Sequence, residues 1–288
     1  DADQFPSHTL LLAKDPYYAF RQAIVVLHGF RKHPSPGISE LAIIDPTAKI
    51  GKDVVIEPHA CIGPNATIGD RTVIYPHCWV GHDATIGEDC VLYPNVTVYE
   101  HCILGNRVVL HAGCVIGQDG FGYATHHGKH EKIPQIGNAV IEDAVEMGAN
   151  CAVDRATVGS TRVGKGSKFS NLVTIGHGST IGDHNLLVAQ VGIAGSVKTG
   201  KYVVMGGQVG VAGHLTIGDM VRLAAQCGVI SDLESQGQYG GTPAFPHGQY
   251  RRTMLLLTKL PELANDVRQL QKQLAQLQAE LPQTDEHP

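Results

Sequence analysis

Aliphatic residues return at every sixth position along most of the chain. One run extends from Ile44 to Ile116 and another from Val163 to Val229. Glycine often follows the aliphatic residue, as at Gly51, Gly63 and Gly69, where a tight corner leaves little room for a Cβ. A period of six is too short for a pair of helices. It predicts a mainly β protein, a parallel β-helix in which three hexads form a triangular coil and equivalent positions stack three hexads apart.

Two interruptions divide the repeat. The hexad frame is lost from Asp119 to Gln135, returns at Ile141, and slips again between Gly159 and Arg162. We therefore expect one β-helix domain over residues 38–235, with an excursion from the coils at residues 118–135.

Residues 1–37 lie outside the repeat. Their pattern predicts a short strand from Thr9 to Ala13, a helix from Tyr17 to about Gly29, and a linker that contains Pro34 and Pro36. This segment is too short to bury a core of its own. We interpret it as the remnant of an α/β N-terminal domain.

Residues 236–288 begin as a loop and continue as a predicted helix from about Gln249 to Leu281. Along this helix, apolar residues alternate three and four positions apart, in a heptad seam formed by Leu260, Leu263, Val267, Leu270, Leu274, Leu277 and Leu281. Such a seam needs partner helices. We expect a homotrimer, because β-helices of this kind associate through flat faces, with a dimeric coil as the alternative.

Composition narrows the functional classes. A net charge of −5 and a pI near 6.3 argue against a nucleic-acid partner. No apolar run reaches the roughly 20 residues that span a membrane, and the start of the chain lacks a signal-peptide pattern, so we expect a cytoplasmic protein. Six of the seven cysteines occupy the fifth hexad position, which indicates packing and neither disulfides nor metal binding: Cys78, Cys90, Cys102, Cys114, Cys151 and Cys227.

One of the 16 histidines has chemically suggestive neighbours. His177 occupies the third position of its hexad, and Gly195 lies three hexads later, where its N–H can act as an oxyanion donor. His214 lies six hexads and one residue after His177, two coils away and shifted by one position. At about 4.8 Å per coil, the two histidines are about 10 Å apart. From spacing alone, His177 is either a catalytic base or a surface histidine.

Longer motifs resemble one enzyme family. They are DGFGYA (119–124), KIPQIG (132–137), VDR (153–155), IGHGSTIGD (175–183), GQVGVAGH (207–214) and RRT (251–253). Together they resemble the UDP-3-O-(3-hydroxyacyl)glucosamine N-acyltransferases over nearly the whole chain. The resemblance implies a left-handed winding of the β-helix. It also implies an enzyme of lipid A biosynthesis that transfers a 3-hydroxyacyl group from acyl carrier protein to the 2-amino group of a UDP-3-O-acylglucosamine.

The resemblance also assigns roles to residues of this chain. His177 matches the general base, Gly195 the oxyanion donor and His214 a second histidine of the site. Expected substrate contacts are Phe121 and Tyr123 in the excursion and, in a segment similar to a family KNPY motif, Asp15, Tyr17 and Tyr18, which can equally form a structural turn. A basic patch for the acidic carrier protein is expected at Arg251, Arg252 and Lys259, with Lys198 and Lys201 on a coil. The phosphopantetheine on the carrier protein is the cofactor implied, with no bound cofactor or metal.

Two departures from the family pattern leave alternatives open. Ser170 stands seven residues before His177, where the family has an Asp that orients the imidazole. The family's uridine-binding domain is represented only by its end. A non-enzymatic or weakly active β-helix is therefore one alternative. Another is a zinc enzyme like the γ-class carbonic anhydrases, because His77 and His82 have ligand spacing, although the third histidine would fall near Leu41, before the repeat.

Overall fold

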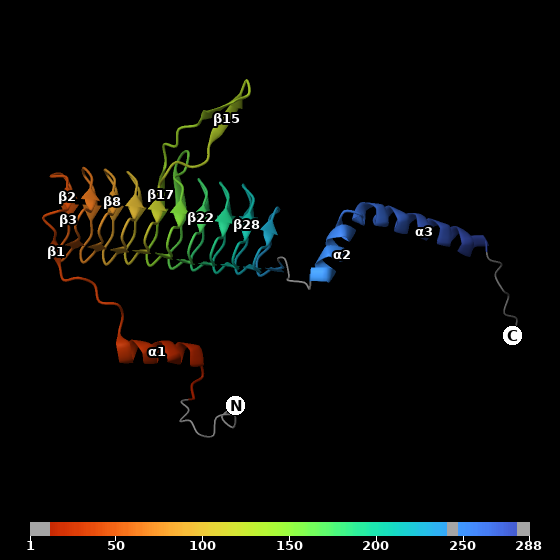
Figure 1. Cartoon of the computed structure of the whole chain (residues 1–288), viewed down its shortest axis with the longest axis horizontal. Coiled ribbons are helices and arrows are strands. Elements are labelled where there is room, and N and C mark those ends of the chain that lie inside the picture. The colour runs from red at the N-terminus through yellow and green to blue at the C-terminus, as the bar shows by residue number, and fades with distance from the viewer. Residues whose placement is uncertain (1–11, 241–246, 281–288) are drawn as a thin grey trace. The chain divides into compact units, whose positions relative to one another are not determined.

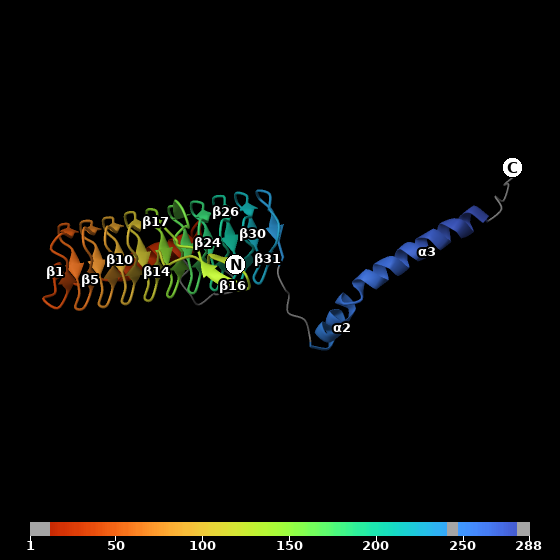
Figure 2. The ribbon, with the colours of Figure 1, turned by 90° about the horizontal axis from the view of Figure 1, so that it is seen from above.

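The computed structural model describes residues 12–240 and 247–280, and the repeat forms a parallel β-helix. Three parallel sheets of 11, 10 and 9 strands form its three faces, and successive strands of the chain lie on successive faces (Figures 1 and 2). Strand partners are three hexads apart in the regular coils, as in the pair Val91 and Val109. The predicted parallel β-helix is confirmed, and so is the spacing of three hexads between residues that stack on each other.

The strands are short, and most contain two residues. The first face contains β1 (Gly37–Ile38), β4 (Val55–Ile56), β7 (Val73–Ile74), β10 (Val91–Leu92), β13 (Val109–Leu110), β18 (Glu146–Met147), β21 (Lys168–Phe169), β24 (Leu186–Leu187), β27 (Val204–Met205), β30 (Arg222–Leu223) and β32 (Gln238–Tyr239). The second face contains β2 (Ile43–Ile44), β5 (Cys61–Ile62), β8 (Trp79–Val80), β11 (Thr97–Val98), β14 (Val115–Ile116), β19 (Ala152–Val153), β22 (Thr174–Ile175), β25 (Gly192–Ile193), β28 (Gly210–Val211) and β31 (Gly228–Val229). The third face contains β3 (Lys49–Ile50), β6 (Thr67–Ile68), β9 (Thr85–Ile86), β12 (Ile103–Leu104), β17 (Asn138–Ile141), β20 (Ser160–Val163), β23 (Thr180–Ile181), β26 (Lys198–Thr199) and β29 (Thr216–Ile217).

The aliphatic residue of each hexad points into the prism and forms the core. Ile74, Leu92 and Leu110, stacked on the first face, are fully buried. The fourth hexad position forms the corner and has positive φ, as at His77 (61°) and His101 (60°), whose side chains are exposed. Stacked aliphatic ladders therefore stabilise each coil against its neighbours, while corner side chains are free to vary.

The cysteines pack inside the coils. All seven are free thiols, and the six at the fifth hexad position are buried, as predicted. Burial raises the pKa of the Cys78 thiol to about 11, and it does the same for the Cys90 thiol. These thiols therefore stay protonated at neutral pH and behave as small apolar side chains.

The predicted excursion is a β-hairpin that projects from the coils (Figure 1). Its antiparallel strands are β15 (Tyr123–His126) and β16 (Lys129–Lys132). The chain rejoins the stack at β17, where Val140 pairs with Ile103. Because of this insertion, more than three hexads of sequence separate the coil partners on its two sides.

The N-terminal segment contains one helix, α1 (Pro16–His28), close to the predicted bounds. Asp15 caps it, since its carboxylate accepts a hydrogen bond from the Tyr18 N–H at 3.0 Å. The predicted strand from Thr9 to Ala13 falls mostly outside the described residues. Its last two residues, Leu12 and Ala13, are not in a strand, so that part of the prediction is wrong.

The C-terminal segment forms two helices, α2 (His247–Leu257) and α3 (Leu260–Glu280), where a single helix was predicted. Pro261 accounts for the break, because proline has no N–H to donate to Leu257 and its ring clashes with that carbonyl. The apolar row of α3 from Leu260 to Leu277 is exposed, and Leu281 lies outside the described residues. Among the described helices, none is long and apolar enough to cross a membrane.

Candidate active site

His177 lies on the corner that follows β22, with its ring against the next coil. Its carbonyl accepts a hydrogen bond from the Ser196 N–H at 2.8 Å. A Cβ added at Gly195 would stand only 2.6 Å from His177 Nε2, so the imidazole occupies the space that a side chain at this position would need. Gly195 therefore has to be glycine for the ring to lie where it does.

The Gly195 N–H is unpaired within the described part of the chain. At equivalent corner positions of the third face, the N–H donates a hydrogen bond to the side chain that lies three hexads later. Lys201 N–H donates to Asp219 at 2.7 Å, and Lys52 N–H donates to Asp70 at 2.7 Å. The residue three hexads after Gly195 is Gly213, which has no side chain to accept this hydrogen bond. The N–H beside His177 is consequently available to a ligand oxygen.

His214 lies two coils from His177 on the same corner, shifted by one position as expected. Its N–H donates to the Gly195 carbonyl at 3.0 Å, and its side chain is exposed. The three residues expected to form the site, His177, Gly195 and His214, therefore lie on three consecutive coils. This geometry agrees with the spacing argument, while their chemical roles stay a prediction.

Asp154 is the carboxylate beside this corner, and no sequence pattern indicated a role for it. Its N–H donates to the Ile175 carbonyl at 2.9 Å, which puts it one coil before His177 and opposite Gly176. Gln118 Nε2 donates to its Oδ1 at 2.7 Å. Burial raises the pKa of the Asp154 carboxyl, while the hydrogen bond from Gln118 and the charge of nearby His177 act in the opposite direction. The second interruption lengthens the sequence between these coil partners, so a count of three hexads does not find them.

Ser170 does not lie beside His177 of the same chain. It follows β21 on the first face, whereas His177 follows β22 on the second, so a whole face of the coil separates them. One face of the coil takes six residues and a full coil takes three hexads. A separation of seven residues therefore leads to the next face and not to the next coil. Within one chain, Ser170 is therefore too far around the coil to orient His177.

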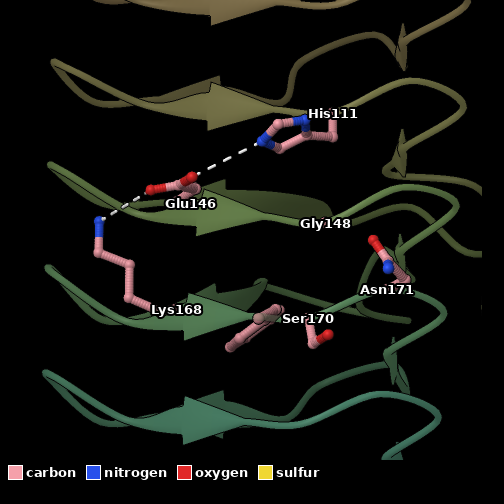
Figure 3. Close-up of a pocket in the computed structure, with 7 residues that line it drawn as sticks. His111, Glu146, Gly148, Lys168, Ser170 and Asn171 are labelled. Atoms are coloured by element: carbon pink, nitrogen blue, oxygen red, sulfur yellow. Dashed lines mark ion pairs between the residues drawn. The ribbon is translucent and has the colours of Figure 1, made fainter. Parts of the chain in front are cut away.

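Ser170 instead lines a shallow hollow on the corner after the first face (Figure 3). Glu146 lies between His111 and Lys168 there, with ion-pair distances of 3.6 Å to His111 Nε2 and 3.7 Å to Lys168 Nζ.

The base of the hairpin is fixed against the same corner as His177. Arg155 is buried, donates to the Gly117 carbonyl at 2.6 Å, and pairs with Glu100 at 2.8 Å. A Cβ on Gly120 would collide with His177, so the first residues of the excursion pack directly on the imidazole. Phe121 follows at once and is 84% exposed.

Both aromatic residues expected to contact substrate are on this hairpin. Phe121 and Tyr123 meet edge to face with ring centroids 5.2 Å apart, and with Thr125 and His130 they line a hollow. Lys132 lies 5.8 Å from the centre of the Tyr123 ring and pairs with Asp119 at 2.7 Å. An apolar surface with the Lys132 ammonium nearby therefore begins beside His177.

The remaining candidates lie elsewhere. The exposed rings of Tyr17 and Tyr18 are on α1, and the Asp15 carboxylate serves as the helix cap, so the turn interpretation accounts for that residue. Arg251 and Arg252 are exposed on α2, with Lys259 in the break before α3. Lys198 is in β26, and Lys201 on the next corner pairs with Asp183 at 3.4 Å.

The histidines of the zinc alternative are not together in one chain. His77 lies on the corner before β8, and His82 lies on the corner after it. A strand therefore separates the two rings.

Comparison with known proteins gives two kinds of match. The family model described as bacterial transferase hexapeptide (six repeats) matches residues 47–82 and 83–118. The UDP-3-O-acylglucosamine N-acyltransferase of Syntrophotalea carbinolica is 52% identical over 273 residues, covering 95% of this chain and 79% of that protein. UDP-3-O-acylglucosamine N-acyltransferase 1 of Koribacter versatilis is 54% identical, with 91% and 77% covered.

Other matches are partial. The chain spans about half the length of some relatives, with 49% coverage of the UDP-3-O-acylglucosamine N-acyltransferase of Anaeromyxobacter dehalogenans strain 2CP-C at 54% identity over 174 residues. Among solved structures, the UDP-N-acetylglucosamine O-acyltransferase of Moraxella catarrhalis RH4 is 26% identical. It has a TM-score of 0.52 and covers 75% of this chain and 77% of that one.

Proposed function

The chain belongs to the UDP-3-O-acylglucosamine N-acyltransferase family, and on this basis we propose that it transfers a 3-hydroxyacyl group from acyl carrier protein to the 2-amino group of a UDP-3-O-acylglucosamine. The observation that carries the proposal is that the His177 imidazole lies beside Gly195 on the adjacent coil, whose backbone N–H has no hydrogen-bond acceptor in the described part of the chain. Acyl transfer to an amine needs a base and an oxyanion donor side by side, and this corner supplies both.

In the proposed mechanism, His177 removes a proton from the amine nitrogen as that nitrogen attacks the thioester carbonyl carbon. The Gly195 N–H donates to the carbonyl oxygen, which becomes negative in the tetrahedral intermediate. The C–S bond then breaks, the amide forms, and the protonated His177 returns the proton to the phosphopantetheine sulfur. His214, two coils from His177, would contact the sugar or donor. Phe121 and Tyr123 would contact an acyl chain.

Asp154 supports His177 in this scheme as a positioning residue. Its carboxylate is fixed by Gln118 and stabilises the imidazolium that forms when His177 accepts the proton. This is the role that the resemblance gave to position 170.

Asp154→Asn is expected to slow transfer about 10- to 100-fold, as loss of a supporting carboxylate commonly does. The same change should raise the melting temperature at about pH 8. Because burial raises the pKa of Asp154 above its ordinary 3.8, its ionised form destabilises the fold above the raised value, and this penalty disappears as pH falls below 3.8. Asp154→Glu, which keeps the charge, should retain more activity. Equal rates for Asp154→Asn and the unaltered protein would remove Asp154 from the mechanism.

We also propose a homotrimer joined in part through α3. The exposed apolar row of this helix, which includes Leu270 (62% exposed) and Leu274 (57%), needs the same row of a second and third copy of the helix to cover it.

We further propose a cytoplasmic protein that binds an acidic carrier protein. Seven free thiols suit the reducing cytoplasm. Exposed Arg251 and Arg252, with Lys259, would receive an acidic carrier protein.

Leu270→Asp with Leu274→Asp is expected to separate the α3 helices and leave the β-helix folded. Charges in the seam oppose its burial, whereas the coils are stabilised by their own aliphatic ladders. Sedimentation equilibrium measures the assembly, and circular dichroism measures the β signal. Gln269→Asp with Gln276→Asp, on the side of the helix away from the apolar row, is the matched control. A monomeric unaltered protein at micromolar concentration would refute association, and a dimer would refute its three-fold form.

The activity itself is tested with purified chain, a UDP-3-O-acylglucosamine and 3-hydroxyacyl carrier protein, by following the free thiol and the N-acylated product. Product formation that depends on both substrates supports the proposal. Absence of product from folded protein would favour the non-enzymatic alternative, and zinc-dependent hydration of carbon dioxide would favour the carbonic anhydrase alternative.

A further inference from the structure

Two histidines and an aspartate meet on the corner after β8 and β11. His82 and Asp83 follow β8, and His101 follows β11 on the next coil. The His101 N–H donates to the His82 carbonyl at 3.1 Å, so the backbones are stacked. The rings of His82 and His101 meet edge to face with centroids 4.9 Å apart.

The ligand atoms of these three side chains converge. The Asp83 carboxylate lies 2.8 Å from His82 Nδ1 and 3.9 Å from His101 Nδ1, and one ligand atom from each residue lies within 4.8 Å of the other two. All three side chains are between 42% and 57% exposed, which leaves them accessible from solvent and free to rotate.

We propose that His82, Asp83 and His101 bind a divalent transition-metal ion of the Zn²⁺ type. Two imidazoles with one carboxylate favour such an ion over Mg²⁺ or Ca²⁺, which prefer oxygen ligands. Metal–ligand bonds of about 2.0–2.2 Å require separations of about 3.3 Å between ligand atoms, so His101 Nδ1 would approach the Asp83 carboxylate and His82 Nδ1 would move slightly away from it, and small side-chain rotations achieve both. Water would complete a tetrahedral shell.

This site is separate from the proposed active site. His82 and His177 follow strands of the same face, and β11, β14 and β19 lie between those strands. At about 4.8 Å per coil the separation is about 20 Å, too far for the ion to act on the acyl group. The ion would instead join two neighbouring coils, and its binding would stabilise the fold by mass action.

The test is titration of the metal-free full chain with Zn²⁺ alone by calorimetry. Asp83→Asn and His101→Asn remove one ligand each. Asparagine suits these positions because both residues have positive φ, 56° and 60°. His77→Asn is the matched control: its φ is 61°, and its ring stacks on His59 at 5.3 Å, outside the His–Asp–His cluster.

We expect one Zn²⁺ per chain bound at this cluster, an affinity at least about tenfold weaker in Asp83→Asn and in His101→Asn, and an unchanged affinity in His77→Asn. Zn²⁺ should also raise the melting temperature of the unaltered protein, and it should do so less in the two ligand variants. No saturable binding, or binding that both ligand variants retain in full, would overturn the proposal. Neither result depends on acyl transfer, which is measured separately.

Discussion

His177→Ala is expected to reduce the rate of acyl transfer by about 10²–10⁴-fold, the usual loss when a general base is removed. The fold should not change, because the imidazole lies on a corner between Gly120 and Gly195 and belongs to none of the aliphatic ladders. The melting temperature and the oligomeric state should therefore stay those of the unaltered protein. Steady-state rates with saturating substrates, measured beside a thermal melt, test this.

His184→Asn is a suitable control for this experiment. His184 is also a corner histidine, although it is exposed where His177 is half-buried, and it stacks on Tyr202 at 5.2 Å, one face away from His177. Its replacement should leave the rate unchanged. Full activity of His177→Ala would refute the central residue of the mechanism, and a folding defect would show that His177 also supports the corner.

The repeat predicted most of the fold because every hexad has the same two requirements. An aliphatic residue at the first position must be buried, and a residue able to adopt positive φ must turn the corner. Counting in sixes therefore assigned strands, corners and the buried cysteines. The same count predicted that His177, Gly195 and His214 lie on consecutive coils, as the backbone hydrogen bonds of Gly195 and Ser196 confirm.

Counting in sixes failed where the frame was interrupted or misapplied. Asp154 lies next to His177, but more than three hexads of sequence separate the paired coils, because the second interruption of the frame lies between them. Ser170 is close in sequence yet a face away. Pro261 was included in a continuous helix, although its missing N–H ends the hydrogen-bond ladder at Leu257. Distances around a coil and along the stack have to be counted separately.

Gly213 was also overlooked, because the role of a glycine here is the absence of a side chain. On the corner after the third face, an Asp or Asn three hexads later accepts the hydrogen bond of the third-position N–H in several coils, as Asn106 does for Glu88 at 2.9 Å. Gly213 leaves the N–H of Gly195 without such an acceptor. The oxyanion donor of the proposed mechanism thus depends on a residue that does not touch the imidazole.

Gly213→Asn is therefore expected to lower the transfer rate by about 10²–10³-fold, the cost of losing one oxyanion donor. The new side-chain oxygen would accept the hydrogen bond from Gly195 N–H, as Asn106 does from Glu88, and would do so without moving His177. Gly213→Ala is the matched control. Its Cβ would have the Gly195 carbonyl oxygen as nearest atom at 3.2 Å, so it fits after a small shift, and it carries no acceptor. Alanine should thus keep most of the activity while asparagine loses it, with similar melting temperatures for both. Equal rates in the two variants would mean that the Gly195 N–H does not stabilise the tetrahedral intermediate, and the oxyanion donor would then have to be sought elsewhere on the corner.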